Sequence, residues 1–391
     1  MTSYRCPVCA AGEPLRFLHR TGVPVHQNLI VTDRRQARDV TRGTLSMVAC
    51  TNCGFVSNED FDLSLLSYGE DYDNTQSCSA YFEAYMDGLV EDLVERQGVR
   101  NATIVEVGTG KGVFLRKLVS YPGANNRGFG FDPSYVGPDS DLDGRLMFRR
   151  SYYDANCADV AADVVVSRHV IEHVPQPLEL LKTVRMALVK SPKARVFFET
   201  PCVDWILRNR VVWDFFYEHC SLFTAQSLAW AFESTGFSVD SVSHIFGDQY
   251  LWIEAHVSDD KPTHLKSDGT TAALAKIYGE VEARLRDHWL RKLLALKKRG
   301  NVALWGAGAK GATFANMVDP DCELIDCVVD LNPKKQGGFI PGTGHPIVAP
   351  SMLPDRAVTS AVLMNPNYRQ ENLQLLNKAG IRLDLIDWNE E

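Results

Sequence analysis

The sequence lacks the features that would place the protein in a membrane or on a nucleic acid. It has no run of the ~18 apolar residues that a membrane-spanning helix needs, and its first residues lack the apolar core of a secretion signal. Basic residues are not in excess, because 41 Lys and Arg face 49 Asp and Glu and give a net charge of −8. We therefore expect a cytoplasmic protein, a monomer or weak homodimer, that acts on a small molecule and has no nucleic-acid or membrane partner.

What is present is an ordinary globular composition over 391 residues, 45% hydrophobic and 23% charged. At ~100–200 residues per domain, this length predicts two or three domains. We place them at 1–73, 74–258 and 259–391, since a polar stretch over 259–275 indicates a linker.

Four of the ten cysteines form two Cys-x-x-Cys pairs in the first block, Cys6 with Cys9 and Cys50 with Cys53. In a reducing compartment such pairs serve metal or redox chemistry more often than disulfides. Two pairs can place four thiolates at the corners of a tetrahedron, the geometry of structural zinc, and so small a block needs a metal to fold stably. We predict a structural zinc site, with four unrelated thiols as the alternative.

The middle of the chain, 99–258, alternates apolar runs with amphipathic segments, which predicts an α/β fold with a parallel sheet. The expected strands are 103–107, 127–131, 163–167, 194–199 and 239–245, and the expected helices are 80–97, 112–120, 176–189 and 224–235. A late hairpin of 239–245 with 249–257 would add an antiparallel edge.

A glycine-rich stretch, 104–112, indicates a strand, a tight turn and a helix. Glu106 precedes Gly108, Gly110 and Gly112, which let a ligand approach the backbone because glycine has no Cβ and tolerates positive φ. The stretch resembles the first motif of class I S-adenosylmethionine (SAM) methyltransferases. The nicotinamide fingerprint has a different spacing, Gly-x-Gly-x-x-Gly, and a glycine turn without a cofactor is the other alternative.

Asp132 ends the second expected strand, 26 residues after Glu106. An acidic residue at this place can accept both ribose hydroxyls of a nucleoside cofactor. With Pro133 and Ser134 it could instead cap a helix, but its position after the glycine loop favours ribose binding.

The loop after the central strand, 167–175, should line the site, because ligands of such sheets lie beyond the carboxyl ends of the strands. It resembles the fourth methyltransferase motif, whose backbone and His flank the cofactor, and this points to Ser167 and His169. Asp154 lies in 151–154, where a loop over the adenine is expected.

The same loop brings two histidines and a carboxylate close together in sequence, His169, Glu172 and His173. A metal site here is disfavoured, since no further carboxylate or His follows at suitable spacing.

Three polar groups, Tyr217, Glu218 and His219, stand in an otherwise aromatic run. Titratable groups buried in an apolar cleft have shifted pKa values and are acid–base candidates. A His and a Glu that satisfy loop backbone are the alternative.

The C-terminal region begins with an amphipathic helix over about 272–298 and continues into a second glycine loop, 302–311. Gly306, Gly308 and Gly311 fit the dinucleotide fingerprint, and Asp330 ends the next strand. The loop predicts a phosphate at a helix N-terminus, either of a dinucleotide or of the nucleotide portion of a substrate.

Taken together, these motifs resemble one family over nearly the whole chain, the SAM-dependent C-methyltransferases of deoxysugar biosynthesis. The resemblance implies a class I SAM methyltransferase (Rossmann-like) core with a small N-terminal zinc-binding domain and a C-terminal Rossmann-like domain. For the cofactor site it implies Tyr72, Ser77, Glu106, Gly108, Gly110, Asp132, Pro133, Asp154, Ser167 and His169. For the other sites it implies zinc on Cys6, Cys9, Cys50 and Cys53, substrate at Gly306, Gly308, Lys310, Asp330 and Asn365, and catalysis by Tyr217, Glu218 and His219.

The activity that this implies is methylation of a carbon next to a ketone, on a sugar carried by a nucleoside diphosphate. His219 would take the proton, Glu218 would hold its tautomer, and Tyr217 would steady the enolate oxygen. The chain departs from the family's substrate loop at His26 and Gln27. The alternatives are O- or N-methylation of another natural-product intermediate, an NAD(P)-dependent oxidoreductase that uses 306–311, and a nucleotide sensor with a decayed methyltransferase domain.

Overall fold

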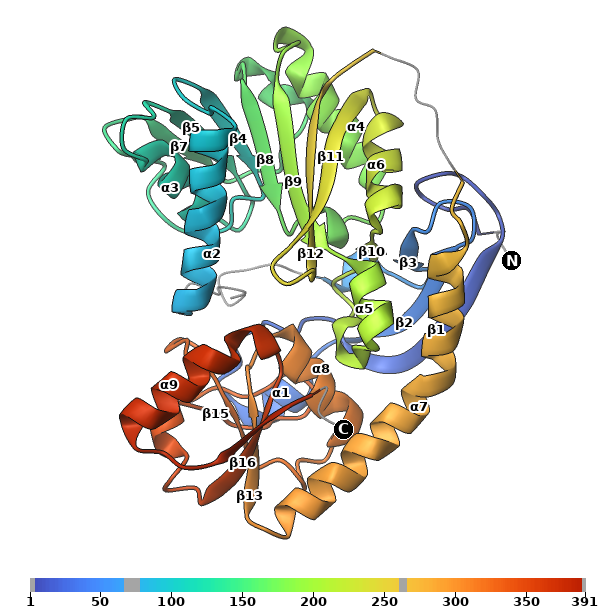
Figure 1. Cartoon of the computed structure of the whole chain (residues 1–391), viewed down its shortest axis with the longest axis vertical. Coiled ribbons are helices and arrows are strands. Elements are labelled where there is room, and N and C mark those ends of the chain that lie inside the picture. The colour runs from blue at the N-terminus through green and yellow to red at the C-terminus, as the bar shows by residue number, and fades with distance from the viewer. Residues whose placement is uncertain (1–3, 67–77, 260–265, 389–391) are drawn as a thin grey trace.

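The computed structural model describes residues 4–66, 78–259 and 266–388 and contains three sheets. Figure 1 shows the central sheet above, the C-terminal lobe below, and the N-terminal strands β1 and β2 beside both. Across these ranges every helix is too short or too polar to cross a lipid bilayer.

The central sheet has eight strands in the order β11-β12-β9-β8-β4-β5-β7-β6. The strands from β9 to β7 run parallel, and β12 enters antiparallel beside β9 in a hairpin with β11. The bounds are β4 Thr103–Val107, β5 Arg127–Phe131, β6 Ser140–Asp141, β7 Leu146–Arg149, β8 Val164–Arg168, β9 Arg195–Pro201, β11 Phe237–Ile245 and β12 Tyr250–Val257. Because parallel strands end at one edge, the loops after β4, β5 and β8 meet there.

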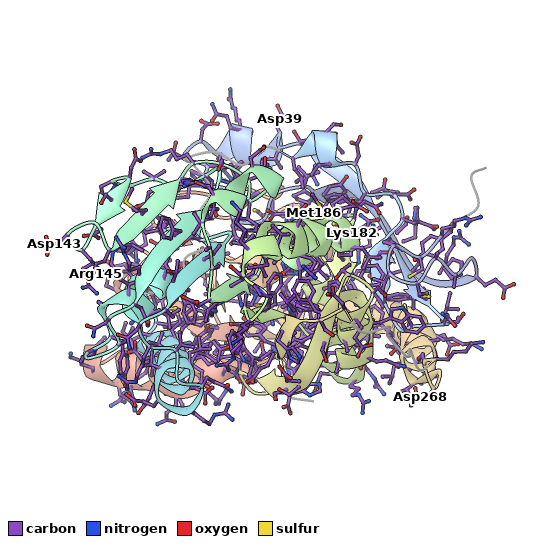
Figure 2. The ribbon with its side chains drawn as sticks, turned by 90° about the horizontal axis from the view of Figure 1, so that it is seen from above. Asp39, Asp143, Arg145, Lys182, Met186 and Asp268 are labelled. Carbon is purple, nitrogen blue, oxygen red and sulfur yellow. The ribbon has the colours of Figure 1, made fainter. Side chains whose placement is uncertain are left out.

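Amphipathic helices cover this sheet. In α4, Leu181, Val184 and Ala187 are buried at helical spacing, whereas Lys182 and Met186 lie on the outer surface (Figure 2). The bounds are α2 Ala80–Glu91, α3 Val113–Ser120, α4 Pro177–Ala187, α5 Val203–Asn209 and α6 Ala225–Glu233.

The N-terminal sheet is antiparallel, in the order β1-β2-β3-β10. Its first three strands come from the start of the chain, but β10 lies between the central strands β9 and β11 in sequence and pairs Ser221 with Ser57. The bounds are β1 Pro14–Pro24, α1 Arg34–Arg38, β2 Arg42–Cys50, β3 Val56–Asn58 and β10 Ser221–Leu222. The N-terminal block therefore shares a sheet with the central region.

The C-terminal lobe is a parallel sheet in the order β15-β14-β13-β16-β17. The bounds are α7 Thr270–Lys297, β13 Asn301–Trp305, α8 Ala309–Val318, β14 Cys327–Val329, β15 Ile347–Val348, β16 Val358–Leu363, α9 Arg369–Ala379 and β17 Asp384–Asp387. The second glycine loop lies between β13 and α8, at the carboxyl edge of this sheet.

One hydrophobic core joins the N-terminal strands to the C-terminal lobe. Trp213, which precedes β10, is at its centre, with ring centroids 6.2 Å from Trp289 of α7, 5.1 Å from Phe314 of α8 and 5.4 Å from Trp388. All three contacts are edge-on, a favoured aromatic geometry.

The strands expected at 103–107 and 127–131 are confirmed as β4 and β5, and the late hairpin is confirmed as β11 and β12. The other expected strands and helices of the central sheet lie within about two residues of their predicted ends, except that α2 gives way after Glu91 to a π-helical turn, Asp92–Arg96. The strands β6, β7 and β10 were not predicted from the sequence.

Tyr217 packs within the N-terminal block and is not among the described residues that line the cleft, which is not where its predicted catalytic role would place it. The side chain is fully buried, and its hydroxyl accepts a hydrogen bond from the Asp62 amide at 2.8 Å and donates one to the Asp62 carbonyl at 3.2 Å. The ring fills the space over Gly43, where a Cβ would overlap it, and packs 5.2 Å from Phe61.

We expect Tyr217→Phe to lower the free energy of unfolding by about 1 kcal/mol, because both hydrogen bonds to Asp62 are lost while the ring packing remains. Urea denaturation measures this change. Methyl transfer should be unaffected in the folded variant, and a large fall in its turnover number would contradict the structural role.

Candidate active site

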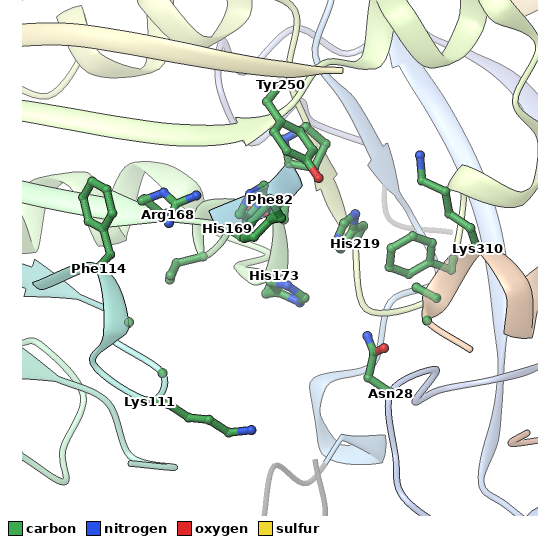
Figure 3. Close-up of a pocket in the computed structure, with 18 of the residues that line it drawn as sticks. Asn28, Phe82, Lys111, Phe114, Arg168, His169, His173, His219, Tyr250 and Lys310 are labelled. Atoms are coloured by element: carbon green, nitrogen blue, oxygen red, sulfur yellow. The ribbon is translucent and has the colours of Figure 1, made fainter. Parts of the chain in front are cut away.

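A cleft of about 1020 Å³ lies between the carboxyl edge of the central sheet and the C-terminal lobe, and both glycine loops line it. Figure 3 shows Lys111 and Arg168 on one side of this cavity, Lys310 on the other, and His173 and His219 between them.

The first glycine loop is built for close approach of a ligand. Gly108 has φ +71°, and a Cβ on it would overlap the Val170 side chain. Gly110 also has positive φ, +54°, but a Cβ there would meet no atom of the described chain within 4 Å. The loop therefore requires glycine at position 108, where it packs against Val170. Beside Gly110 it leaves an open space, the cradle, that a ligand could enter.

Two carboxylates flank this cradle. Glu106 is buried, and burial raises its pKa to about 7 although the Thr109 hydroxyl donates a hydrogen bond to it at 2.5 Å. Asp132 accepts a hydrogen bond from the Gly110 amide at 2.8 Å and from the Ser134 amide at 2.8 Å. Asp132 thus holds both the glycine loop and the turn at Ser134 in shape. It lies in the place predicted for ribose binding.

The second glycine loop is constructed in the same way. Gly306 has φ +118°, a Cβ on Gly311 would overlap the Gly306 carbonyl, and Asp330 accepts a hydrogen bond from the Ala307 amide at 2.8 Å. In both loops the aspartate after the neighbouring strand therefore holds a loop amide.

Lys310 and Asn365 of the C-terminal lobe reach across to the central region. The Lys310 Nζ lies 2.8 Å from Asp214 Oδ2 and donates to Gln249 Oε1 at 3.3 Å. Gln249 Nε2 donates to Asn365 Oδ1 at 3.1 Å. All of these residues line the cleft, but nothing in the local sequence marks Asp214 or Gln249 as site residues.

A buried charge network lies behind the first loop and was also missed. Arg168 pairs with Glu199 at 2.6 Å, while His169 approaches Glu199 at 2.9 Å and Glu172 at 3.2 Å. Burial alone lowers the pKa of His169, but the two carboxylates outweigh it and raise that pKa to about 9. His169, which has φ +55°, is therefore a cation at neutral pH.

Other predicted cofactor residues are placed differently. Pro133 lines the cleft, but Asp154 and Ser167 are not among the described lining residues. The Asp154 carboxylate accepts a hydrogen bond from the Asn156 amide at the start of a 3-10 helix, and the Ser167 hydroxyl donates to the Val107 carbonyl at 2.9 Å. Tyr72 and Ser77 lie outside the described residues.

His219 lies in the cleft between the two loops. Its ring is 4.0 Å from that of Phe216 and 4.9 Å, edge-on, from that of His173. Burial lowers the pKa of His219 well below its usual range, and electrostatic repulsion from the neighbouring His173, His169 and Lys310 lowers it further. The imidazole is therefore neutral near pH 7 and has a lone pair available.

Glu218 does not hold the His219 tautomer, and this prediction is wrong. Its fully buried carboxylate lies 3.3 Å from His26 Nδ1 and accepts a hydrogen bond from the Gln27 amide at 3.0 Å. Consecutive side chains of this turn point in different directions, so Glu218 binds the N-terminal block while His219 faces the cleft. The next residue of that block, Asn28, lines the cleft.

The four predicted zinc ligands are brought together. The Sγ atoms of Cys6 and Cys53 are 3.7 Å apart, those of Cys9 and Cys50 are 3.5 Å apart, and all four lie within 4.8 Å of one another. Zinc–sulfur bonds of ~2.3 Å in a tetrahedron require a spacing of roughly 3.8 Å, so the cluster is compatible with zinc.

Two family models match the chain, a methyltransferase domain over 81–242 and a C-methyltransferase C-terminal domain over 266–388. The C-methyltransferase NovU of Streptomyces niveus is 25% identical over an alignment of 389 residues, and the alignment covers 94% of this chain and 90% of that protein.

Two solved methyltransferases show partial likeness only. The Burkholderia thailandensis 1,6-didemethyltoxoflavin-N1-methyltransferase has 16% identity and a TM-score of 0.35, over 45% of this chain and 80% of its own. RosA of Streptomyces davawensis has 18% identity and a TM-score of 0.35, over 46% and 55%.

The two family models lie side by side along the chain, and the relative NovU spans both of them. The central sheet that the first model covers has the parallel core and the antiparallel β12 of the class I methyltransferase fold. The chain therefore has a methyltransferase domain followed by a C-methyltransferase C-terminal domain, and it is a SAM-dependent methyltransferase.

Proposed function

We propose that the enzyme methylates a carbon next to a ketone, on a sugar carried by a nucleoside diphosphate, with His219 as the base. The observation that carries this proposal is the position of the His219 imidazole in a cleft between two glycine loops, where burial lowers its pKa. One loop suits the cofactor and the other suits the anionic end of a substrate, so the base lies where the reacting carbon would be.

On the cofactor side, the open cradle at Gly110 and the buried Glu106 fit SAM, because the methionine end of the cofactor is charged and must approach the backbone closely. Gly108, Gly110, Glu106 and Asp132 would hold it. When bound, SAM supplies an electrophilic methyl group.

On the substrate side, the loop amides at the start of α8 and the ammonium of Lys310 suit a diphosphate. Gly306 and Gly308 leave room for it, and Asp330 keeps the loop in shape by holding the Ala307 amide. Asn365 and Asp214 would then adjoin the bound substrate.

The chemistry assigned to the chain is proton removal. A ketone acidifies the neighbouring C–H bond, His219 accepts that proton, and negative charge grows on the ketone oxygen. Burial is the main cause of the low pKa of His219, and the cationic groups His169 and Lys310, which lower that pKa further, would also stabilise this charge. In this proposal His169 and Lys310 stabilise the enolate oxygen, which is the role expected for Tyr217 from the sequence.

We also propose that Cys6, Cys9, Cys50 and Cys53 bind a structural zinc ion. Three of these cysteines are buried in the core that contains Phe55 and Phe223, so the metal would brace the N-terminal sheet against the central region, away from the cleft.

We expect His219→Gln to lower turnover by ~10²–10⁴-fold, since a positioned base contributes about that much. Formation of S-adenosylhomocysteine with a panel of nucleotide-linked keto-sugars measures turnover, and calorimetry with SAM should show unchanged affinity. His256→Gln, at a surface histidine beside Asp240, is the matched control. Retained turnover in the His219 variant would show that another group is the base.

The pKa of His219 predicts an unusual pH profile. A base acts in its deprotonated form. Because the pKa of His219 is lowered, the fall in activity that protonation causes should occur at lower pH than for an ordinary imidazole. The turnover number at saturating SAM should therefore stay flat between about pH 8 and pH 6. An ordinary imidazole would be about three-quarters protonated at pH 6. A midpoint near pH 6.5 would contradict this environment for His219.

Removal of zinc should lower the melting temperature, because the N-terminal block loses the metal that holds its two cysteine pairs together. Metal analysis should give one tightly bound zinc ion per chain, lost in Cys9→Ser and retained in Cys78→Ser, which replaces an exposed cysteine outside the cluster. A zinc content that is unchanged in Cys9→Ser would exclude this site.

A further inference from the structure

A second group of metal-ligand side chains lies inside the cleft. Glu172 and His173 belong to the 3-10 turn after β8, Ile171–His173, and His219 comes from the loop before β10. Their ligand atoms all lie within 4.8 Å of one another. A metal here was disfavoured because no further carboxylate or His follows at suitable spacing in the sequence, and the fold supplies a histidine from 46 residues away in the chain.

His169 is nearer to Glu172 in the sequence than His219, but it already pairs with two carboxylates. Its Nδ1 lies 3.2 Å from Glu172 and its Nε2 lies 2.9 Å from Glu199, so both ring nitrogens face carboxylates. His219 has a different environment, since its neighbours are the rings of Phe216 and His173.

Glu172 is the fixed member of the group. It is fully buried, and its two oxygens contact the Thr200 hydroxyl at 3.1 Å and His169 at 3.2 Å. Such contacts orient a ligating carboxylate without using all its lone pairs. The two imidazoles border the open cleft (Figure 3), so their rotation can bring the ligand atoms to the ~2.0–2.2 Å that zinc requires.

We propose that Glu172, His173 and His219 form a second metal site, which takes a borderline divalent cation such as Zn²⁺, Co²⁺ or Ni²⁺. Two imidazoles and one carboxylate are ligands that these cations favour. The cleft leaves a fourth position open to water, and the site has no thiolate, so it binds metal less tightly than the four-cysteine cluster.

Occupation of this site inhibits the enzyme. A cation on His219 takes the lone pair that would accept the substrate proton, and this consequence rests on the proposed role of His219 as base. Excess zinc would therefore act as an inhibitor, even though zinc at the cysteines stabilises the fold.

The test starts from protein that already carries its tightly bound zinc. Co²⁺ is then titrated in, with visible absorption and metal analysis after equilibrium dialysis as readouts. We expect one further equivalent, with an affinity at least ~10-fold lower in His173→Asn and in His219→Asn. The matched control His256→Asn should bind it as the unmodified enzyme does, because His256 lies outside the group.

Turnover is then measured at rising Co²⁺ and Zn²⁺. Inhibition that follows occupancy and is reversed by a chelator supports the whole proposal. Absence of a second equivalent, or binding that is unchanged in His173→Asn, overturns the site. Binding at this site without inhibition, or with activation, overturns the inhibitory role and the assignment of His219 as base, and leaves the metal site standing.

Discussion

The packing of Trp213 against Trp289, Phe314 and Trp388 is the contact on which the cleft depends. The two glycine loops belong to different sheets, and neither sheet alone encloses a ligand. Trp213 lies a few residues before His219 in the chain, so the same segment that joins the hydrophobic core also carries the histidine into the cleft. A shift of the C-terminal lobe would move Lys310 away from Asp214 and open the substrate side of the cavity.

Charge within the cleft is distributed so that one imidazole is positive and another is neutral. His169 has carboxylates at both ring nitrogens, and these outweigh the effect of burial on its pKa. His219 has an aromatic ring and a second imidazole as neighbours, and cationic groups nearby, so burial and charge act in the same direction. Residue type alone therefore says little about which histidine can act as a base.

Much of the framework could be predicted from local sequence. Gly108 and Gly110, the acidic residues at 132 and 330, and the two cysteine pairs each carry their own signal, because tight turns and metal knuckles impose residue types at short spacing. The parallel strands β4, β5, β8 and β9 were predicted within about two residues because a buried strand is rich in apolar residues, whereas the short parallel strand β7 was missed. Asp154 and Ser167 lie near the site in sequence, but they satisfy backbone groups of their own loops.

The sequence by itself determined the class of fold, the two glycine loops and the cysteine cluster. Only the tertiary structure decided which members of the 217–219 triplet face the cleft, since direction in a turn depends on what lies around it. Tyr217 points to Asp62, Glu218 to His26 and Gln27, and His219 to the cavity. The tertiary structure also placed His219 beside His173, and Asp214 beside Lys310, because the partners of a buried charge come from distant parts of the chain.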